Sequence, residues 1–143
     1  DRLQEGLVAT GKAYFQPGKV HSLSLFALTP VRTRELRGLA QQALGPLADT
    51  VDLVYSTSCL DVLPRGIDKG MGVALLSETI QVPMSNMLGV GDSDVDLPFL
   101  ARVGLRAAPA NANHAVRQSV DYLSAHPNGD GVREILQHFG LLP

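Results

Sequence analysis

The sequence is poor in cysteine, in clustered basic residues and in long apolar runs, and each shortage excludes a class of protein. Cys59 is the single cysteine among 143 residues, so no disulfide can form within the chain and a reducing, cytoplasmic setting is expected. The basic residues are scattered apart from Arg32, Arg34 and Arg37, which argues against a nucleic-acid partner. No apolar run approaches the ~20 residues that cross a bilayer, so no membrane association is expected.

The residues that are present suit a packed domain. Hydrophobic residues make up 45% of the chain and charged residues 18%, and the formal net charge is -2. This balance favours a folded core over disorder, and the length fits one ordinary domain or two small ones. Because the first residue is Asp1 rather than methionine, residue 1 is not expected to be the natural N-terminus.

Apolar periodicity and turn residues divide the chain into two patterns. Residues 1–64 read as strand, helix, strand, strand, and residues 65–143 alternate helix and strand. Such alternation predicts a parallel sheet with flanking helices, so the expected fold class is α/β. Thr29 and Asp130 are the expected N-caps of the first and last helices. The expected strands cover residues 19–28, 51–58, 60–63, 87–90, 104–108 and 120–123, and the expected helices cover 30–44, 68–79, 95–101, 113–119 and 131–139.

An acidic turn follows the expected strand at residues 87–90. Asp92, Asp94 and Asp96 crowd into six residues with the sequence GDSDVD, directly after that strand. Sites in open α/β sheets lie at the carboxyl ends of strands, and Mg²⁺ takes oxygen ligands such as carboxylates. The turn therefore predicts a Mg²⁺ site, while the alternative is a solvated acidic turn that caps the next helix.

Lys69 stands at the expected start of the helix at residues 68–79. A helix N-terminus favours anions through its free N–H groups and its dipole, and an ammonium group there strengthens a phosphate site. The alternative is an ordinary exposed lysine. The order of lysine, helix, apolar strand and acidic turn favours the phosphate site.

These motifs resemble those of the haloacid dehalogenase superfamily of phosphohydrolases. Residues 66–70 (GIDKG) are similar to its third motif and residues 91–96 to its fourth, and the likeness continues through residues 107–112 and 122–132. Residues 1–63 resemble the cap of the Cof-type branch, which includes phosphatases for sugar phosphates, sucrose phosphate and mannosyl-phosphoglycerate. The resemblance implies a small α/β cap domain in residues 1–64, followed by part of a Rossmann-like core in residues 65–143.

The resemblance also implies a role for each matching residue. Lys69 would neutralise the substrate phosphate and the nucleophile, and Asp92 would bind Mg²⁺ directly. Asp96 would bind the metal directly or through water, Ser93 would support the metal loop, and Asn111 would help to hold Lys69 or the phosphate. A cation clamp of Mg²⁺ and lysine suits phosphoryl transfer, which depends on charge neutralisation and positioning.

The sequence departs from the family where the attacking group should be. The first motif is an apolar strand followed by Asp-x-Asp-Gly-Thr, and no such run is present; the second motif is also missing, since residues 52–58 fit the cap better. The chain is therefore expected to be the C-terminal part of a larger enzyme, inactive alone because it lacks the aspartate nucleophile. Without the first-motif strand, the core sheet would keep an open edge that invites self-association.

Two functions remain open at this point. The leading one is a Mg²⁺-dependent phosphatase of a small phosphorylated metabolite, with a sugar phosphate as the expected substrate. The alternative is a non-catalytic module or subunit that keeps the metal and phosphate site for binding. A receiver-like domain fits less well, because it would need an acidic cluster nearer the N-terminus.

Overall fold

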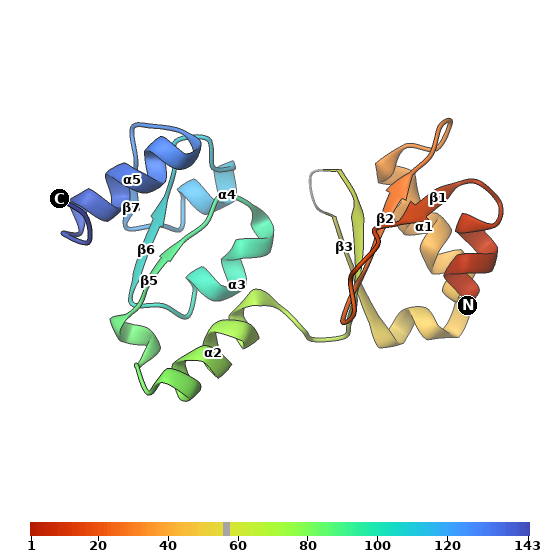
Figure 1. Cartoon of the computed structure of the whole chain (residues 1–143), viewed down its shortest axis with the longest axis horizontal. Helices are drawn as coiled ribbons and strands as arrows, with labels where there is room; N and C mark the ends of the chain where they lie inside the picture. Colours follow the sequence, from red (N-terminus) through yellow and green to blue (C-terminus); the bar gives the residue numbers. More distant parts are fainter. Residues whose placement is uncertain (56–57) are drawn as a thin grey trace. The chain divides into compact units, whose positions relative to one another are not determined.

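The computed structural model describes residues 1–55 and 58–143 and confirms the α/β class. The chain folds as two compact units, Asp1–Ile67 and Asp68–Pro143 (Figure 1). The first contains an antiparallel sheet and the second a parallel one. No helix in the described residues is long and apolar enough to cross a membrane. The cap and core roles of the two parts stay predictions.

The first unit is a four-stranded sheet with one long helix. Its strands are β1 (Ala13–Phe15), β2 (Leu23–Ala27), β3 (Val51–Tyr55) and β4 (Leu60–Pro64), in the antiparallel order β1-β2-β4-β3. The helix α1 (Thr33–Leu44) places Leu36, Ala40 and Leu44 at four-residue spacing against a core that includes Leu25 and Leu60. Short helical turns, η1 (Gln4–Val8) and η2 (Gly45–Thr50), complete the unit.

Several predicted boundaries in the first unit are wrong. Helix α1 begins at Thr33 and not after Thr29, because residues 28–31 form a turn and the backbone N–H of Arg32 donates to Glu35 Oε2 at 3.2 Å, which caps the helix at this point. The strand expected over residues 19–28 is limited to β2, and β1 was missed. The strand expected over residues 51–58 begins as β3, and residues 56–57 lie outside the described part of the chain.

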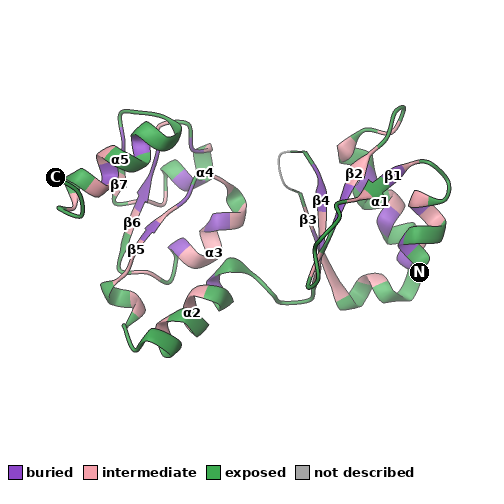
Figure 2. Cartoon of the chain, viewed as in Figure 1, coloured by how far each residue is buried: buried purple, intermediate pink, exposed green. Residues whose placement is uncertain are grey.

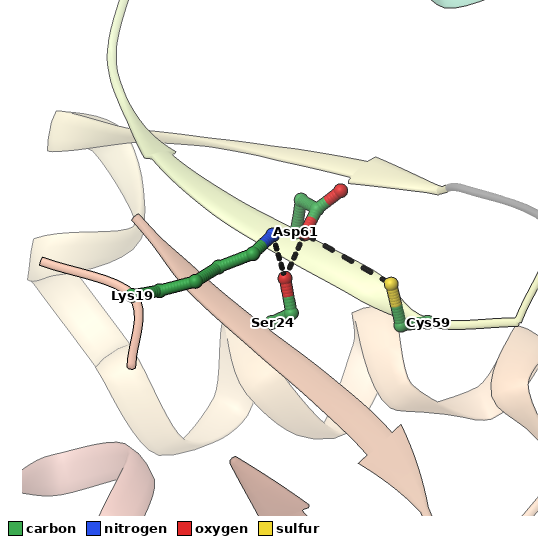
Figure 3. A network of polar contacts seen from close by, with 4 residues as sticks. All are labelled: Lys19, Ser24, Cys59 and Asp61. Atoms are coloured by element: carbon green, nitrogen blue, oxygen red, sulfur yellow. Dashed lines mark hydrogen bonds and ion pairs between the residues drawn. The ribbon is translucent and has the colours of Figure 1, made fainter. Parts of the chain in front are cut away.

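Ser24 is fully buried on β2 and belongs to a polar network within the first unit (Figure 3). Its hydroxyl donates to Asp61 on β4, and Lys19 Nζ donates to Ser24 Oγ at 2.5 Å and lies 3.3 Å from Asp61 Oδ1. Cys59 is buried, as is common for a free cysteine, and its Sγ lies 3.9 Å from the same carboxylate. The network satisfies the buried hydroxyl and ties residue 19 to the sheet.

The second unit is a parallel sheet with flanking helices, as the alternating pattern predicted. Its strands β5 (Leu88–Val90), β6 (Leu105–Ala108) and β7 (Tyr122–Leu123) lie in the order β5-β6-β7. The helices are α2 (Lys69–Ile80), α3 (Leu97–Leu100), α4 (His114–Arg117) and α5 (Asn128–His138), with single turns at η3 (Met84–Asn86) and η4 (Asp94–Asp96). Leu100, Ala108, Ala112 and Val116 form a buried hydrophobic cluster in this unit.

Helix α5 begins three residues earlier than expected, and Asp130 is not its N-cap. Pro127 occupies that position, and Asp130 lies in the first turn. Gly131 lies inside the helix, and only glycine fits there, because a Cβ would lie 2.2 Å from the carbonyl oxygen of His126. Close packing of the helix on the preceding loop therefore overrides propensity.

Helix α2 is apolar on every side and scarcely buried. Gly70 is its one buried position, while Met71, Leu75, Leu76 and Ile80 are each at least 45% exposed, and Figure 2 shows the helix mostly in the exposed colour. Helices that are apolar all round normally lie inside a protein. Among the described residues β5 pairs with β6 alone, so β5 is an edge strand of the same unit.

Candidate functional site

The acidic turn lies at the carboxyl end of β5 and borders an open cavity of about 380 Å³ within the second unit. Three strand-end loops and the start of α2 surround this cavity. Its lining residues are Lys69, Val90, Gly91, Asp92, Asp96, Pro109, Asn128 and Val132. The position matches the rule that sites in parallel sheets form beyond the carboxyl ends of the strands.

Asp96 is the most heavily bonded side chain of the cavity, and it is 5% exposed. Its Oδ1 lies 2.5 Å from Lys69 Nζ, and its Oδ2 accepts from the backbone N–H of Asp92 at 2.9 Å and of Ser93 at 3.1 Å. The Ser93 hydroxyl adds a third contact at 3.2 Å. Burial by itself raises the pKa of the Asp96 carboxyl, but the bonds from Lys69, Asp92 and Ser93 outweigh it and hold the pKa below its ordinary value.

Lys69 reaches Asp96 because α2 approaches α3 closely. The Asp68 side chain accepts from the N–H of Met71 at 2.8 Å and so caps α2 directly before Lys69. One residue later, a Cβ on Gly70 would lie 2.6 Å from the carbonyl oxygen of Pro98, so only glycine fits there. The Lys69 side chain remains 56% exposed, which leaves its ammonium open to a ligand in the cavity.

Gly91 allows the acidic turn to fold back on itself. A Cβ at this position would lie 2.6 Å from Asp96 Cβ, so a larger residue would push the Asp96 side chain out of the turn. The Gly91 N–H donates to the Ala107 carbonyl at 3.2 Å, which anchors the turn to β6. The glycine in the motif is thus a steric requirement of the clamp around Asp96.

Asp92 differs from Asp96 in having an exposed carboxylate. In residues 1–55 and 58–143 that carboxylate has no hydrogen-bond or ion-pair partner, although it borders the same cavity. The described residues contain no group of three or more His, Cys, Asp and Glu side chains that could enclose a metal. Asp92 lies beside Asp96 and Ser93, and the three side chains present only oxygen atoms, which is the ligand type that Mg²⁺ takes in proteins.

Asn111 contacts the start of α5, and its role toward Lys69 or the phosphate stays a prediction. Its Oδ1 accepts from the backbone N–H of Asn128 at 2.6 Å, and no contact within the described residues joins it to Lys69. Sequence reasoning passed over Asn113, whose Nδ2 donates to Asp94 Oδ1 at 2.7 Å and whose N–H donates to the Asp92 carbonyl at 2.8 Å. The sequence signal for Asn113 was its position as the N-cap of α4, where its Oδ1 accepts a hydrogen bond from the backbone N–H of Val116.

The sequence also matches a family of known enzymes. Residues 19–136 match the model of the haloacid dehalogenase-like hydrolases. The chain belongs to this family. The phosphoglycolate phosphatase of Methanothrix thermoacetophila is 33% identical over 99 residues, which are 69% of this chain and 45% of that protein. The phosphoglycolate phosphatase of Thermoplasma volcanium is 34% identical over 88 residues, 62% of this chain and 39% of that protein.

Solved structures support the haloacid dehalogenase-like fold. A Thermoplasma acidophilum protein aligns with a TM-score of 0.77 at 20% identity, over 99% of this chain and 60% of its own. A haloacid dehalogenase-like hydrolase from Bacteroides thetaiotaomicron aligns with a TM-score of 0.71 at 23% identity, over 85% of this chain and 44% of its own. The matched part of the chain spans less than half the length of these curated relatives.

Proposed function

We propose that this chain is the metal- and phosphate-binding part of a Mg²⁺-dependent phosphatase of the haloacid dehalogenase-like family. The observation that carries the proposal is the pair Lys69–Asp96 beside the unpartnered carboxylate of Asp92, in one cavity at the carboxyl end of β5. Phosphoryl transfer needs concentrated positive charge next to an ordered anion site, and this cavity offers a lysine and a cation site together.

Each residue has a role that follows from its contacts. Asp92 would hold Mg²⁺, which would supply charge neutralisation to the phosphate when it is bound. Lys69 would contact a phosphate oxygen, since its side chain is 56% exposed and lines the cavity. Asp96 orients Lys69 and holds the acidic turn, with both of its oxygens already engaged, so its contact with the metal would run through water. Ser93 supports that turn through its N–H and hydroxyl.

A second segment of polypeptide would have to supply the attacking carboxylate. The sequence has no Asp-x-Asp-Gly-Thr run, and the curated relatives are more than twice as long as the part that matches. The open edge of β5 and the exposed apolar side chains of α2 fit such a segment, because both invite pairing and burial. In its absence we expect the same surface to promote self-association.

The substrate would be a small phosphomonoester. Relatives named phosphoglycolate phosphatase at about a third identity favour a phosphorylated carboxylic acid, while a solved structure titled a sugar phosphatase is 21% identical and carries the fold alone. Phosphoglycolate therefore stands ahead of the sugar phosphate expected from the sequence, and the two should be compared directly in the completed enzyme.

Titration of the chain with Mg²⁺ and then with inorganic phosphate tests the proposal. We expect Asp92→Asn to abolish Mg²⁺ binding and Lys69→Ala to abolish phosphate binding, while Asp49→Asn, an exposed carboxylate in the first unit, changes neither. If the wild-type chain and the three variants bound Mg²⁺ and phosphate equally, the proposal would be refuted.

Hydrolysis of p-nitrophenyl phosphate tests whether the chain lacks its nucleophile, and the upstream reading frame separates the two functions. If the chain alone does not hydrolyse this substrate, the result agrees with a missing nucleophile. If it shows Mg²⁺-dependent hydrolysis that Asp92→Asn removes, the expectation of a missing nucleophile is contradicted. A non-catalytic module is favoured if the natural reading frame upstream of Asp1 encodes no strand with Asp-x-Asp-Gly-Thr.

A further inference from the structure

Glu134 on α5 accepts four hydrogen bonds from residues 122–126, which are strand β7 and the loop that follows it. Its carboxylate accepts from the Tyr122 hydroxyl at 2.8 Å, from the Ser124 hydroxyl, and from the backbone N–H groups of Ala125 at 3.0 Å and His126 at 3.3 Å. The bond from Ser124, followed by that from Tyr122, holds the pKa of Glu134 below its ordinary value, so the group is ionised at neutral pH. A charge with this many donors is a fixed anchor for the loop.

The anchored loop is bonded in turn to the loop that follows β6. Ser124 is buried, and its hydroxyl lies 2.9 Å from the His126 N–H, while the His126 carbonyl accepts from the Ala110 N–H at 2.9 Å. Two residues further on, the Asn128 N–H donates to Asn111 Oδ1 at 2.6 Å. The position of Asn128 is therefore set from both sides, by Glu134 through its loop and by Asn111 directly.

Asn128 borders the cavity that contains Lys69, Asp92 and Asp96. Its φ of 52° lies in the left-handed region, which asparagine tolerates better than most residues. Its backbone N–H is engaged by Asn111, but no partner for its exposed side-chain amide occurs in the described residues. The amide is thus a free donor at the edge of the proposed phosphate site, on the side formed by α5.

We propose that Asn128 is a further ligand-contacting residue of this cavity, whose side-chain amide donates to a phosphate oxygen, and that Glu134 is the positioning residue that holds it there. The proposal rests on the proposed function, since it concerns the same cavity. It extends the site from the ends of α2 and β5 to the start of α5. It also gives Asn111 an indirect part, as the acceptor that fixes the Asn128 backbone.

The test measures the affinity of the chain for inorganic phosphate at saturating Mg²⁺ and, separately, for Mg²⁺ alone, by calorimetry. Asn128→Gly keeps the left-handed backbone and removes only the amide. We expect it to weaken phosphate binding about tenfold, as for the loss of one hydrogen bond to a charged group, with Mg²⁺ affinity unchanged. Glu134→Ala should give the same selective loss, and Glu134→Gln, which keeps an acceptor, should restore most of it. Gln137→Ala, one turn further along α5, is the matched control.

The outcomes separate the two proposals. If the wild-type chain binds no phosphate, or Lys69→Ala binds it normally, the proposed function fails and this inference fails with it. If Lys69→Ala loses phosphate but Asn128→Gly and Glu134→Ala bind it like wild type, the inference alone is overturned. Parallel loss of Mg²⁺ and phosphate affinity in Glu134→Ala, with Asn128→Gly unaffected, would show a merely structural role. Should Glu134→Ala fail to fold, Asn128→Gly and Glu134→Gln decide the matter.

Discussion

Replacement of Asp96 by alanine is the sharpest test of how the acidic turn is built. The substitution leaves the backbone N–H groups of Asp92 and Ser93 without their acceptor and releases the Lys69 ammonium. Each buried donor left unpaired costs about 1–3 kcal/mol, whereas the ion pair adds little because Lys69 is more than half exposed. Part of the donor penalty is relieved by water entering the open cavity. We therefore expect a loss of roughly 2–4 kcal/mol in the stability of the second unit.

Thermal unfolding by circular dichroism and amide hydrogen exchange measure this loss. For a unit of this size, each kcal/mol lowers the Tm by about 4–8 °C, so the shift should be at least ~8 °C. The amides of Asp92 and Ser93 should lose their protection first. Asp92→Ala is the control, because its exposed carboxylate has no partner in the described residues, and its effect should stay within about 0.5 kcal/mol. Equal effects of the two substitutions would refute the account of Asp96 as the acceptor that organises the turn.

Three further predictions concern acid stability, packing and association. Folding lowers the pKa of the Asp96 carboxyl, so Asp96 stabilises the fold above the unfolded pKa near 3.8, and this stabilisation is lost as the pH falls below that value. Lys69→Met should therefore reduce the loss of stability at acid pH in a titration followed by circular dichroism. Gly70→Ala should destabilise the chain by about 1–3 kcal/mol in urea unfolding, whereas Gly72→Ala, with no described atom within 4 Å of the added carbon, should stabilise it by about 0.5–1 kcal/mol. Leu75→Glu, which places a charge on a side chain that is 66% exposed, should reduce self-association in light scattering, and an unchanged mass distribution would contradict a role for α2.

The sequence predicted best what depends on local chemistry. The alternation after residue 64 led to the parallel sheet, and the glycine and aspartates of the acidic turn led to the cavity at the end of β5. It predicted the start of α1 poorly, because two nearby segments both have the composition of a helix start. The α1 start was placed too early because Thr29 and Pro30 have the composition of a helix start, while the actual cap is the contact between Arg32 and Glu35.

Polar side chains whose partners lie far along the chain show a second limit. In the pattern of β2, Ser24 falls on the face opposite Leu23 and Leu25, yet Ser24 is fully buried and Leu23 is 42% exposed. Its burial depends on Asp61, 37 residues later, which no local pattern can reveal. Glu134 is a comparable case, since an acidic residue on an amphipathic helix reads as solvated until its four donors from residues 122–126 are known.

Binding and chemistry should be separable in this chain, because the cavity is assembled without the element that would attack phosphorus. Asp92 is held through its N–H by Asp96 and through its carbonyl by Asn113, and Lys69 is placed by the packing of Gly70 on α3. All of these contacts are made inside the second unit. The proposed anion and cation sites are therefore preorganised before any further strand joins the edge of β5. A strand that pairs there in parallel would bring its carboxyl end to the acidic turn, so one added segment could convert a binding site into a catalytic one.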